Sequence, residues 1–430
     1  MGVSRRVGSG VPPPSAPTPF LCRTDYRGAV AGYRDLLRTP GVARIMAAQL
    51  TARFPNGMTS LAILLHIEFV TGSYGAAGLV LAATSVGQAI AGPVTSRWMG
   101  VWGMRRVLTT TLVICAFAIA AIALVDTIVP VYMVLGLIAG LSTPPVQSAV
   151  RTIYPKMVTS RQLTPLFSFD ASLQEVIWIV APVVITLVAT QVGTVQALLL
   201  IVAILVGGGA WFILSPEVGR VRIPRSRRSI GKVLGKPQVL LATVIGFLLI
   251  GACASVEAGV VATFDHGGLE AGIVLAIFSI GSLAGGLSLG HIPIGRWAMA
   301  RRLAIMAVGL CLTVFSLNIF WLGATLFVAG IGIAPALAVL FAMTSASVKF
   351  SETAEAYGWI GTGQLIGAAA GSAVAGFLID GTGPTGAYWA AAIFAIVGTA
   401  VAVACVRFFP DLRHRDPSPI PDTEPVGTIT

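Results

Sequence analysis

The feature that most constrains the fold is a series of apolar runs, each long enough to cross a membrane. A helix needs about 20 residues to cross a ~30 Å hydrocarbon layer. The predicted spans are residues 45–70, 75–97, 107–126, 129–150, 164–189, 195–214, 238–263, 269–290, 303–321, 324–346, 355–379 and 387–408. Helices are required because lipid offers no hydrogen-bond partner to the backbone. The sequence therefore predicts an all-α membrane protein with twelve transmembrane helices.

Composition agrees with a membrane protein. Of 430 residues, 56% are hydrophobic and 10% are charged, whereas a soluble protein carries about 25% charged residues. The net charge of +11 is explained by basic loops, so we expect no nucleic-acid partner. The five cysteines are scattered without paired spacing, and we expect neither a disulfide nor a metal site. No cofactor motif is present, so we expect no cofactor.

A ten-residue stretch occurs twice and suggests an internal duplication. Residues 78–87 return as residues 272–281, an offset of 194, with six of ten positions identical. The two copies fall in spans two and eight, which are equivalent positions if a unit of six spans was duplicated. We therefore predict two pseudo-symmetric six-helix bundles, with Gly78 and Gly272 in equivalent places.

The basic residues predict the orientation in the membrane. Lys and Arg follow the even-numbered spans and the last span, while the opposite loops contain none. By the positive-inside rule both termini are cytoplasmic, in the plasma membrane. The predicted parts are a disordered cytoplasmic arm (1–43), a first bundle (44–214), a basic linker (215–237), a second bundle (238–408) and a disordered cytoplasmic tail (409–430).

The loop after span two carries the most specific local motif. It runs from Gly92 through Arg97 to Arg105 and Arg106, with Ser96 before Arg97. With the twelve spans and the basic central loop, residues 45–408 resemble the major facilitator superfamily, whose signature here is Gly, three residues, Asp-Arg, then a basic cluster. Because Ser96 replaces the acid, we assign the conformational role to the glycine and the three arginines, which hold the cytoplasmic side against the second half or against lipid headgroups.

Arg53 is the first candidate for a substrate or ion-coupling site. It lies well inside span one, where a charge costs about 2.5–3.5 kcal/mol and needs a partner or a wet cavity. Pro55 and Gly57 predict a break in the helix, and Asn56 lies within that break. The alternative is a structural ion pair.

Glu175 in span five is the expected partner of Arg53, because both lie about ten residues from the cytoplasmic start of their spans. Asp170 is the second choice, and we interpret it as a solvated helix end. Glu257 lies near the outer end of span seven. Gln147 and Gln364 are further candidates for lining a cavity. Arg151 is placed at the cytoplasmic end of span four and is not counted as an intramembrane arginine.

The leading hypothesis is a secondary active transporter of a small molecule, proton-coupled and working by alternating access, with export preferred. The resemblance implies this activity, and we expect a monomer whose partners are the substrate, a proton and the bilayer. A metabolite importer remains an alternative, as do a membrane-embedded enzyme and a non-transporting receptor. We expect no enzyme, since the sequence shows no metal-ligand pair, nucleophile elbow or nucleotide-binding loop.

Overall fold

The computed structural model describes Gly2 and residues 33–224, 230–264, 269–290, 292–413 and 416–422. Most of the predicted N-terminal arm (residues 1 and 3–32) therefore lies outside the described residues. Its last part differs from the prediction, because Tyr33–Arg38 forms a short helix, α1. Leu36 of this helix is fully buried, so an apolar contact anchors a segment that the polar, proline-rich composition predicted to be disordered.

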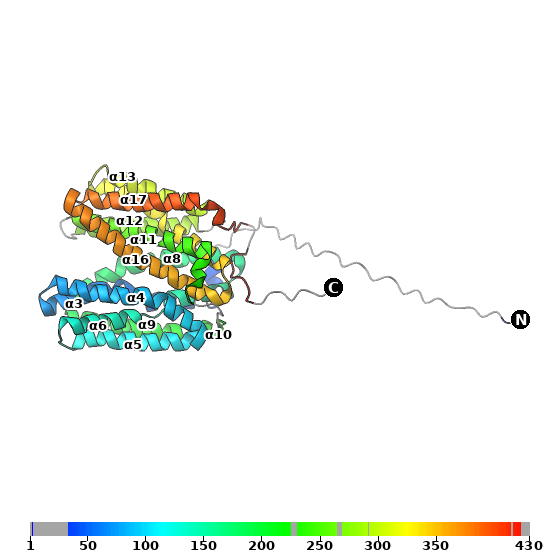
Figure 1. The fold of residues 1–430 in the computed structure, drawn as a ribbon, viewed down its shortest axis with the longest axis horizontal. Helices are drawn as coiled ribbons and strands as arrows, with labels where there is room; N and C mark the ends of the chain where they lie inside the picture. The colour runs from blue at the N-terminus through cyan, green and yellow to red at the C-terminus, as the bar shows by residue number, and fades with distance from the viewer. Residues whose placement is uncertain are drawn as a thin grey trace. The chain divides into compact units, whose positions relative to one another are not determined.

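Helices account for all the predicted spans (Figure 1). In the first half they are α2 (Val42–Arg53), η1 (Phe54–Gly57), α3 (Thr59–Thr71), α4 (Tyr74–Trp102), α5 (Met104–Leu124), α6 (Val129–Leu141), α7 (Val146–Ile153), η2 (Tyr154–Lys156), α8 (Ser160–Gln191) and α9 (Thr194–Leu214). After α10 (Pro216–Arg220) and η3 (Lys232–Gly235), they are α11 (Pro237–Thr263), α12 (Leu269–Leu289), α13 (Ala298–Thr313), α14 (Ile319–Ile331), α15 (Ile333–Ser347), α16 (Phe350–Thr382), α17 (Thr385–Ala404) and η4 (Val406–Phe408).

Ten of the helical segments in the described residues are long and apolar enough to cross a membrane. The other two predicted spans are divided or short. Span one consists of α2 and α3, with 12 and 13 residues, and span nine is α13, with 16. All twelve predicted spans are thus helical, and the fold class is confirmed.

Two spans of the first half are broken near their middle, and span ten of the second half is divided at Gly332 into α14 and α15. Span one changes to a 3-10 turn at η1, which contains Pro55, as the sequence predicted. Span four is interrupted between α6 and α7, which the prediction missed. Pro144 and Pro145 lie in that gap, and since proline has no backbone N–H, two consecutive prolines cannot continue the helical hydrogen bonds.

The repeated glycines have similar surroundings in the two halves. A Cβ on Gly87 would lie 2.6 Å from the carbonyl oxygen of Leu137 in α6, so α4 and α6 pack backbone to backbone. The corresponding Gly281 approaches the carbonyl oxygen of Phe327 in α14 in the same way. Each pair joins the second and fourth spans of its half. This likeness supports the predicted duplication; the boundaries at 44–214 and 238–408 stay a prediction.

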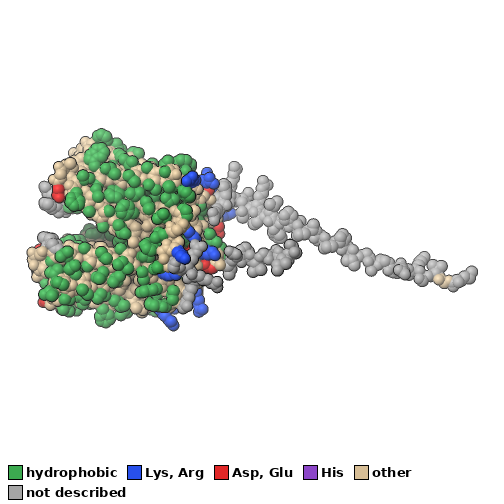
Figure 2. Space-filling model, viewed as in Figure 1, with side chains coloured by type: hydrophobic (Ala, Val, Ile, Leu, Met, Phe, Trp, Pro, Cys, Tyr) green, Lys and Arg blue, Asp and Glu red, His purple; other side chains and the backbone are tan. Residues whose placement is uncertain are grey.

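The two halves meet along six helices, three from each half. In the first half α4 packs against α16 of the second half, and α8 packs against α12 and α15. The short helix α7 also contacts α16. Figure 2 shows Lys and Arg gathered at one end of the helices and a recess between the two groups of helices at the other end. We call these the basic end and the open end.

The start of the C-terminal tail corrects the prediction of disorder. The N–H of Ile420 donates to the carbonyl of Val348 at 2.9 Å, and the carbonyl of Ile420 accepts from the N–H of Phe350 at 3.0 Å. The Ser351 hydroxyl donates to Asp422 at 2.6 Å. The N–H of Ser351 also donates to Asp422 at 3.3 Å, so the tail supplies acceptors to two N–H groups in the first turn of α16 that have no partner within the helix. The helix start therefore binds the tail.

The same tail touches two other places. The N–H of Leu412 donates to the carbonyl of Ile294 at 2.9 Å. Burial raises the pKa of Asp416, but hydrogen bonds from Ser160 and Ser418 outweigh it and hold the pKa below its usual value. Because Ser160 begins α8, the tail contacts the first half as well as the second. We call residues 409–413 and 416–422 the strap.

Candidate functional site

A buried polar cluster joins α2, α7 and α8 at the level of the two helix breaks. Arg53 Nη1 lies 3.1 Å from Asp170 Oδ1, and Arg151 Nε lies 3.1 Å from Asp170 Oδ2. The hydroxyl of Tyr154 donates to Asp170 at 3.1 Å, and the Gln49 amide donates at 3.0 Å. The three charged side chains are at most 3% exposed. One carboxylate therefore neutralises one of two buried guanidinium groups.

Each helix supplies this cluster with two residues spaced four apart. The pairs are Gln49 and Arg53 in α2, Gln147 and Arg151 in α7, and Asp170 and Gln174 in α8. Residues at this spacing share one helix face, so all three faces converge. The Gln49 oxygen accepts from Arg53 at 2.8 Å, and the Gln147 oxygen, with its amide turned toward Arg151, accepts at 2.5 and 2.9 Å. Amide oxygens thus complete the surroundings of both guanidiniums.

The structure corrects the expected partner of Arg53. Asp170, the second choice, forms the ion pair, and Glu175 does not. The cause is helix geometry: with 3.6 residues per turn, position 175 is rotated well away from position 170 while position 174 stays near it. Asp170 is fully buried, so its interpretation as a solvated helix end was wrong. Arg151 was likewise dismissed, yet it is buried in the cluster.

Glu175 instead faces the second half. Its Oε1 accepts a hydrogen bond of 3.0 Å from Ser282 in α12, whose oxygen also accepts from the N–H of Ala334 at 3.2 Å. Glu257 of α11 is exposed and lies within electrostatic range of Glu175. Two acids from opposite halves therefore lie near one another at the interface.

Direct contacts between the halves close the basic end. Arg97 Nη1 in α4 pairs with Glu355 Oε2 in α16 at 2.7 Å. Gly92 and Gly358 lie backbone to backbone, since a Cβ on Gly358 would lie 2.5 Å from the Gly92 oxygen. The Thr362 hydroxyl donates to the carbonyl of Ala89 at 2.7 Å. The predicted loop motif thus contributes Gly92 and Arg97 to this closure.

A layer of buried aromatic rings lies beside the polar cluster. Phe167 of the first half is 6.4 Å from both Phe341 and Tyr357 of the second half, measured between ring centroids. The Arg151 guanidinium carbon lies 3.4 Å from the centroid of Phe341. Arg151 therefore contacts Asp170 in its own half and an aromatic ring in the other half. This side chain connects the polar cluster to the contacts that close the basic end.

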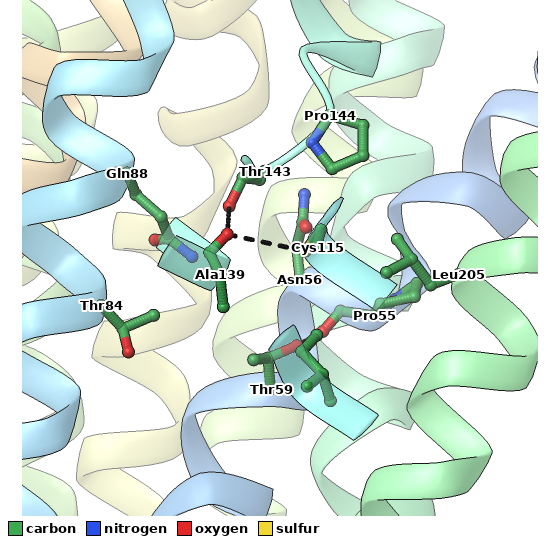
Figure 3. Close-up of a pocket in the computed structure, with 11 residues that line it drawn as sticks. Pro55, Asn56, Thr59, Thr84, Gln88, Cys115, Ala139, Thr143, Pro144 and Leu205 are labelled. Atoms are coloured by element: carbon green, nitrogen blue, oxygen red, sulfur yellow. Dashed lines mark hydrogen bonds between the residues drawn. The ribbon is translucent and has the colours of Figure 1, made fainter. Parts of the chain in front are cut away.

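A pocket in the first half lies where the two broken spans meet (Figure 3). Its empty volume is ≈ 330 Å³, including the part open to solvent. Asn56 of η1 and Gln88 of α4 reach it, together with the hydroxyls of Thr59, Thr84 and Thr143. The lining carries no charged side chain, so the pocket suits water or a small neutral polar group. Asn56 is thus placed away from the charged cluster.

The other sequence candidates are dispersed. Gln364 of α16 packs near Gly246 of α11. Arg105 donates to the carbonyl of Ser215 at 3.2 Å, within the first half, and Arg106 is exposed. Of the three loop arginines, Arg97 has a described ion pair with the second half.

Sequence reasoning missed Glu355, Ser282 and Tyr154 and undervalued Arg151. The repeated spacing of Gln and Arg, four apart in both spans one and four, was the signal that could have identified Arg151. Among the described residues, no group of three His, Cys, Asp or Glu side chains could hold a metal ion.

Comparisons with known proteins bear on the family and the fold of the chain. The family model of the Major Facilitator Superfamily matches residues 45–304 and 258–428. No curated protein matches the chain. Similar solved structures include the human organic anion transporter MFSD10, with 14% identity, a TM-score of 0.65 and coverage of 84% of this chain and 99% of that one.

Two further solved structures share the fold. A bacterial homologue of the iron transporter ferroportin, in an outward-facing state, has 13% identity, a TM-score of 0.69 and coverage of 84% of this chain and 98% of that one. The E. coli fucose:proton symporter has 14% identity, a TM-score of 0.66 and coverage of 84% and 97%.

Proposed function

Because the chain belongs to the major facilitator superfamily, we propose that it is a secondary transporter that moves a small molecule across the plasma membrane by alternating access. The observation that carries this proposal is the asymmetry of the interface between the halves. Contacts such as Arg97 with Glu355 close the basic end, while a recess separates the helices at the other end (Figure 2). A rocking motion of the two halves would exchange the closed and the open end.

The orientation follows from the charge distribution. Lys and Arg gather at the closed end (Figure 2), and from the positive-inside rule we infer that this end faces the cytoplasm, with both termini on the same side. The described conformation is then outward-facing. We propose export of the substrate in preference to import, with import as the alternative.

We propose proton coupling through Glu175. Its carboxylate contacts Ser282 across the interface between the halves, so a rocking motion changes its surroundings. A carboxylate that loses a hydrogen-bond donor and its access to water binds a proton more readily. Protonation of Glu175 would thereby depend on which end is open.

The test of alternating access is a reversible cross-link at the basic end. In a cysteine-free background, Ala89→Cys and Thr362→Cys place two thiols where α4 and α16 touch. Protein in proteoliposomes is assayed with a compound chosen by a thermal-shift screen. Oxidation should stop exchange of that compound, and reduction should restore it. Exchange that continues at full rate with the cross-link formed would refute the mechanism.

The test of proton coupling is Glu175→Gln, which keeps the shape and cannot ionise. Uphill accumulation driven by a proton gradient should be lost while exchange at equal concentrations remains. Gln191→Glu, a change at the exposed end of the same helix, serves as the control for altered charge in α8. Unchanged uphill transport in the Glu175 variant would leave this residue with a structural role.

A further inference from the structure

The polar cluster carries more positive than negative charge. Arg53 and Arg151 are both buried, and among the described residues Asp170 is the carboxylate paired with them. Asp170 is already saturated, because its two oxygens accept from both arginines, Gln49 and Tyr154. A buried guanidinium without an anion is costly, since its charge has left water without full compensation. The cluster therefore carries one positive charge that its own carboxylate does not balance, and a second anion would balance it.

Gln174 marks the position that this anion would take. Its Oε1 accepts from Arg53 Nη2 and also lies 3.5 Å from Arg151 Nη2, so one neutral oxygen bridges both guanidiniums. Gln174 is one turn beyond Asp170 along α8, toward the open end. Asp170 is fully buried whereas Gln174 is partly exposed. A solute that enters from the open end thus meets the Gln174 amide before it meets Asp170.

The shape of the Gln174 side-chain amide indicates which kind of anion could take its position. A carboxylate and a primary amide have nearly the same planar outline, so the space that holds the Gln174 amide fits a carboxylate. Guanidinium groups bind carboxylates through paired N–H donors, and these charged hydrogen bonds are stronger than bonds to a neutral oxygen. An incoming carboxylate that displaces the Gln174 amide would form charged hydrogen bonds with both guanidinium groups.

We propose that the substrate is an organic anion whose carboxylate binds between Arg53 and Arg151 in place of the Gln174 amide. This inference rests on the proposed transport function and names its substrate class. Arg151 also stacks on Phe341 of the second half, 3.4 Å from the ring centroid. A carboxylate that binds Arg151 would shift its guanidinium relative to Phe341 in the other half. Substrate binding would thereby change a contact between the halves at the closed basic end.

The experiment compares carboxylates with their own amides. Purified full-length protein is titrated with benzoate, lactate and succinate and with benzamide, lactamide and succinamide, and thermal unfolding is recorded. At least one carboxylate should raise the unfolding temperature of the wild type, and its amide should not. If no carboxylate stabilises the protein, or if the amides act equally well, the proposal is overturned.

Gln174→Glu tests the site itself. The new carboxylate occupies the proposed anion position, so the ligand-free variant should unfold at a higher temperature than the wild type. Its affinity for the active carboxylate should fall by roughly 10- to 100-fold, the range that a charged hydrogen bond supports. Gln191→Glu, an equal change of charge at the exposed end of α8, should retain the wild-type affinity.

The outcomes separate this inference from the proposed function. Wild-type affinity in the Gln174 variant would show that the anion binds elsewhere and would overturn the site. Stabilisation by cationic or neutral compounds alone would overturn the substrate class, while the cross-linking experiment at Ala89 and Thr362 could still support transport. A cross-link without effect on exchange would overturn transport even if carboxylates bind.

Discussion

The contact between Gly92 and Gly358 offers a direct way to shift the conformational equilibrium. Gly358→Ala would place a Cβ 2.5 Å from the Gly92 carbonyl oxygen and 2.8 Å from Cα of Pro93. Both neighbours are backbone atoms, so they cannot move aside as a flexible side chain can. Since ordinary van der Waals contacts lie near 3.5–4.0 Å, α4 and α16 must separate by about 1 Å to accept the methyl group.

The added methyl group destabilises only the conformation in which the basic end is closed. Overpacking a tight contact costs about 1–3 kcal/mol. The two glycines belong to opposite halves, so the clash exists while the basic end is closed and disappears when the halves part. A penalty of this size changes the ratio of the two conformations by roughly 5- to 150-fold in favour of the one that is open at the basic end.

The assay is a distance measurement across the basic end. Spin labels at Arg106→Cys and Arg301→Cys, two exposed positions in opposite halves, report the separation in a cysteine-free background. Gly358→Ala should increase the fraction of long distances. Gly361→Ala is the matched control, because nothing lies within 4 Å of a Cβ at that position of the same helix. Equal distance distributions in the two variants would refute the reasoning.

Two further perturbations act on the same end of the protein. Glu355→Gln removes the ion pair with Arg97; since charged hydrogen bonds contribute about 1.5–3 kcal/mol, the spin-label distances should again lengthen, and an unchanged distribution would mean that this pair does not hold the closure. Ser351→Ala removes the hydroxyl that binds Asp422, so trypsin should cut the strap at Arg413 faster than in the wild type, and an equal rate of cleavage would show that this contact does not anchor the strap.

The sequence predicted the helices well because membrane crossing leaves few choices. Lipid demands a helix of about 20 apolar residues, and all twelve predicted spans are helical. The break at Pro55 was also predictable, since proline removes a helical hydrogen bond. The break at Pro144 and Pro145 carried the same signal and was missed because the surrounding run is apolar.

The partners within the site were harder to predict, because pairing depends on rotation about the helix axis. Depth alone could not distinguish Asp170 from Glu175, which differ by less than two turns in height. The helix face on which a residue lies determines which of the two acids pairs with Arg53. Asp170 and Gln174 are four residues apart and therefore share the face that points to Arg53. Contacts between the halves, such as Glu355 with Arg97, depend on which conformation is present, and a sequence pattern does not encode that choice.

The strap has a consequence for the order of events during synthesis. A chain is made from its N-terminus, and its early parts can fold before its late parts exist. The partners of the strap, at Ser160, Ile294 and Val348, belong to earlier segments, whereas Leu412, Asp416 and Ile420 are made after all the membrane helices that the structure describes. A nascent protein can therefore hold its described membrane helices in the bilayer before the strap binds across the basic end. A stop codon directly after residue 408 would yield a protein that has inserted fully and has never been closed in this way.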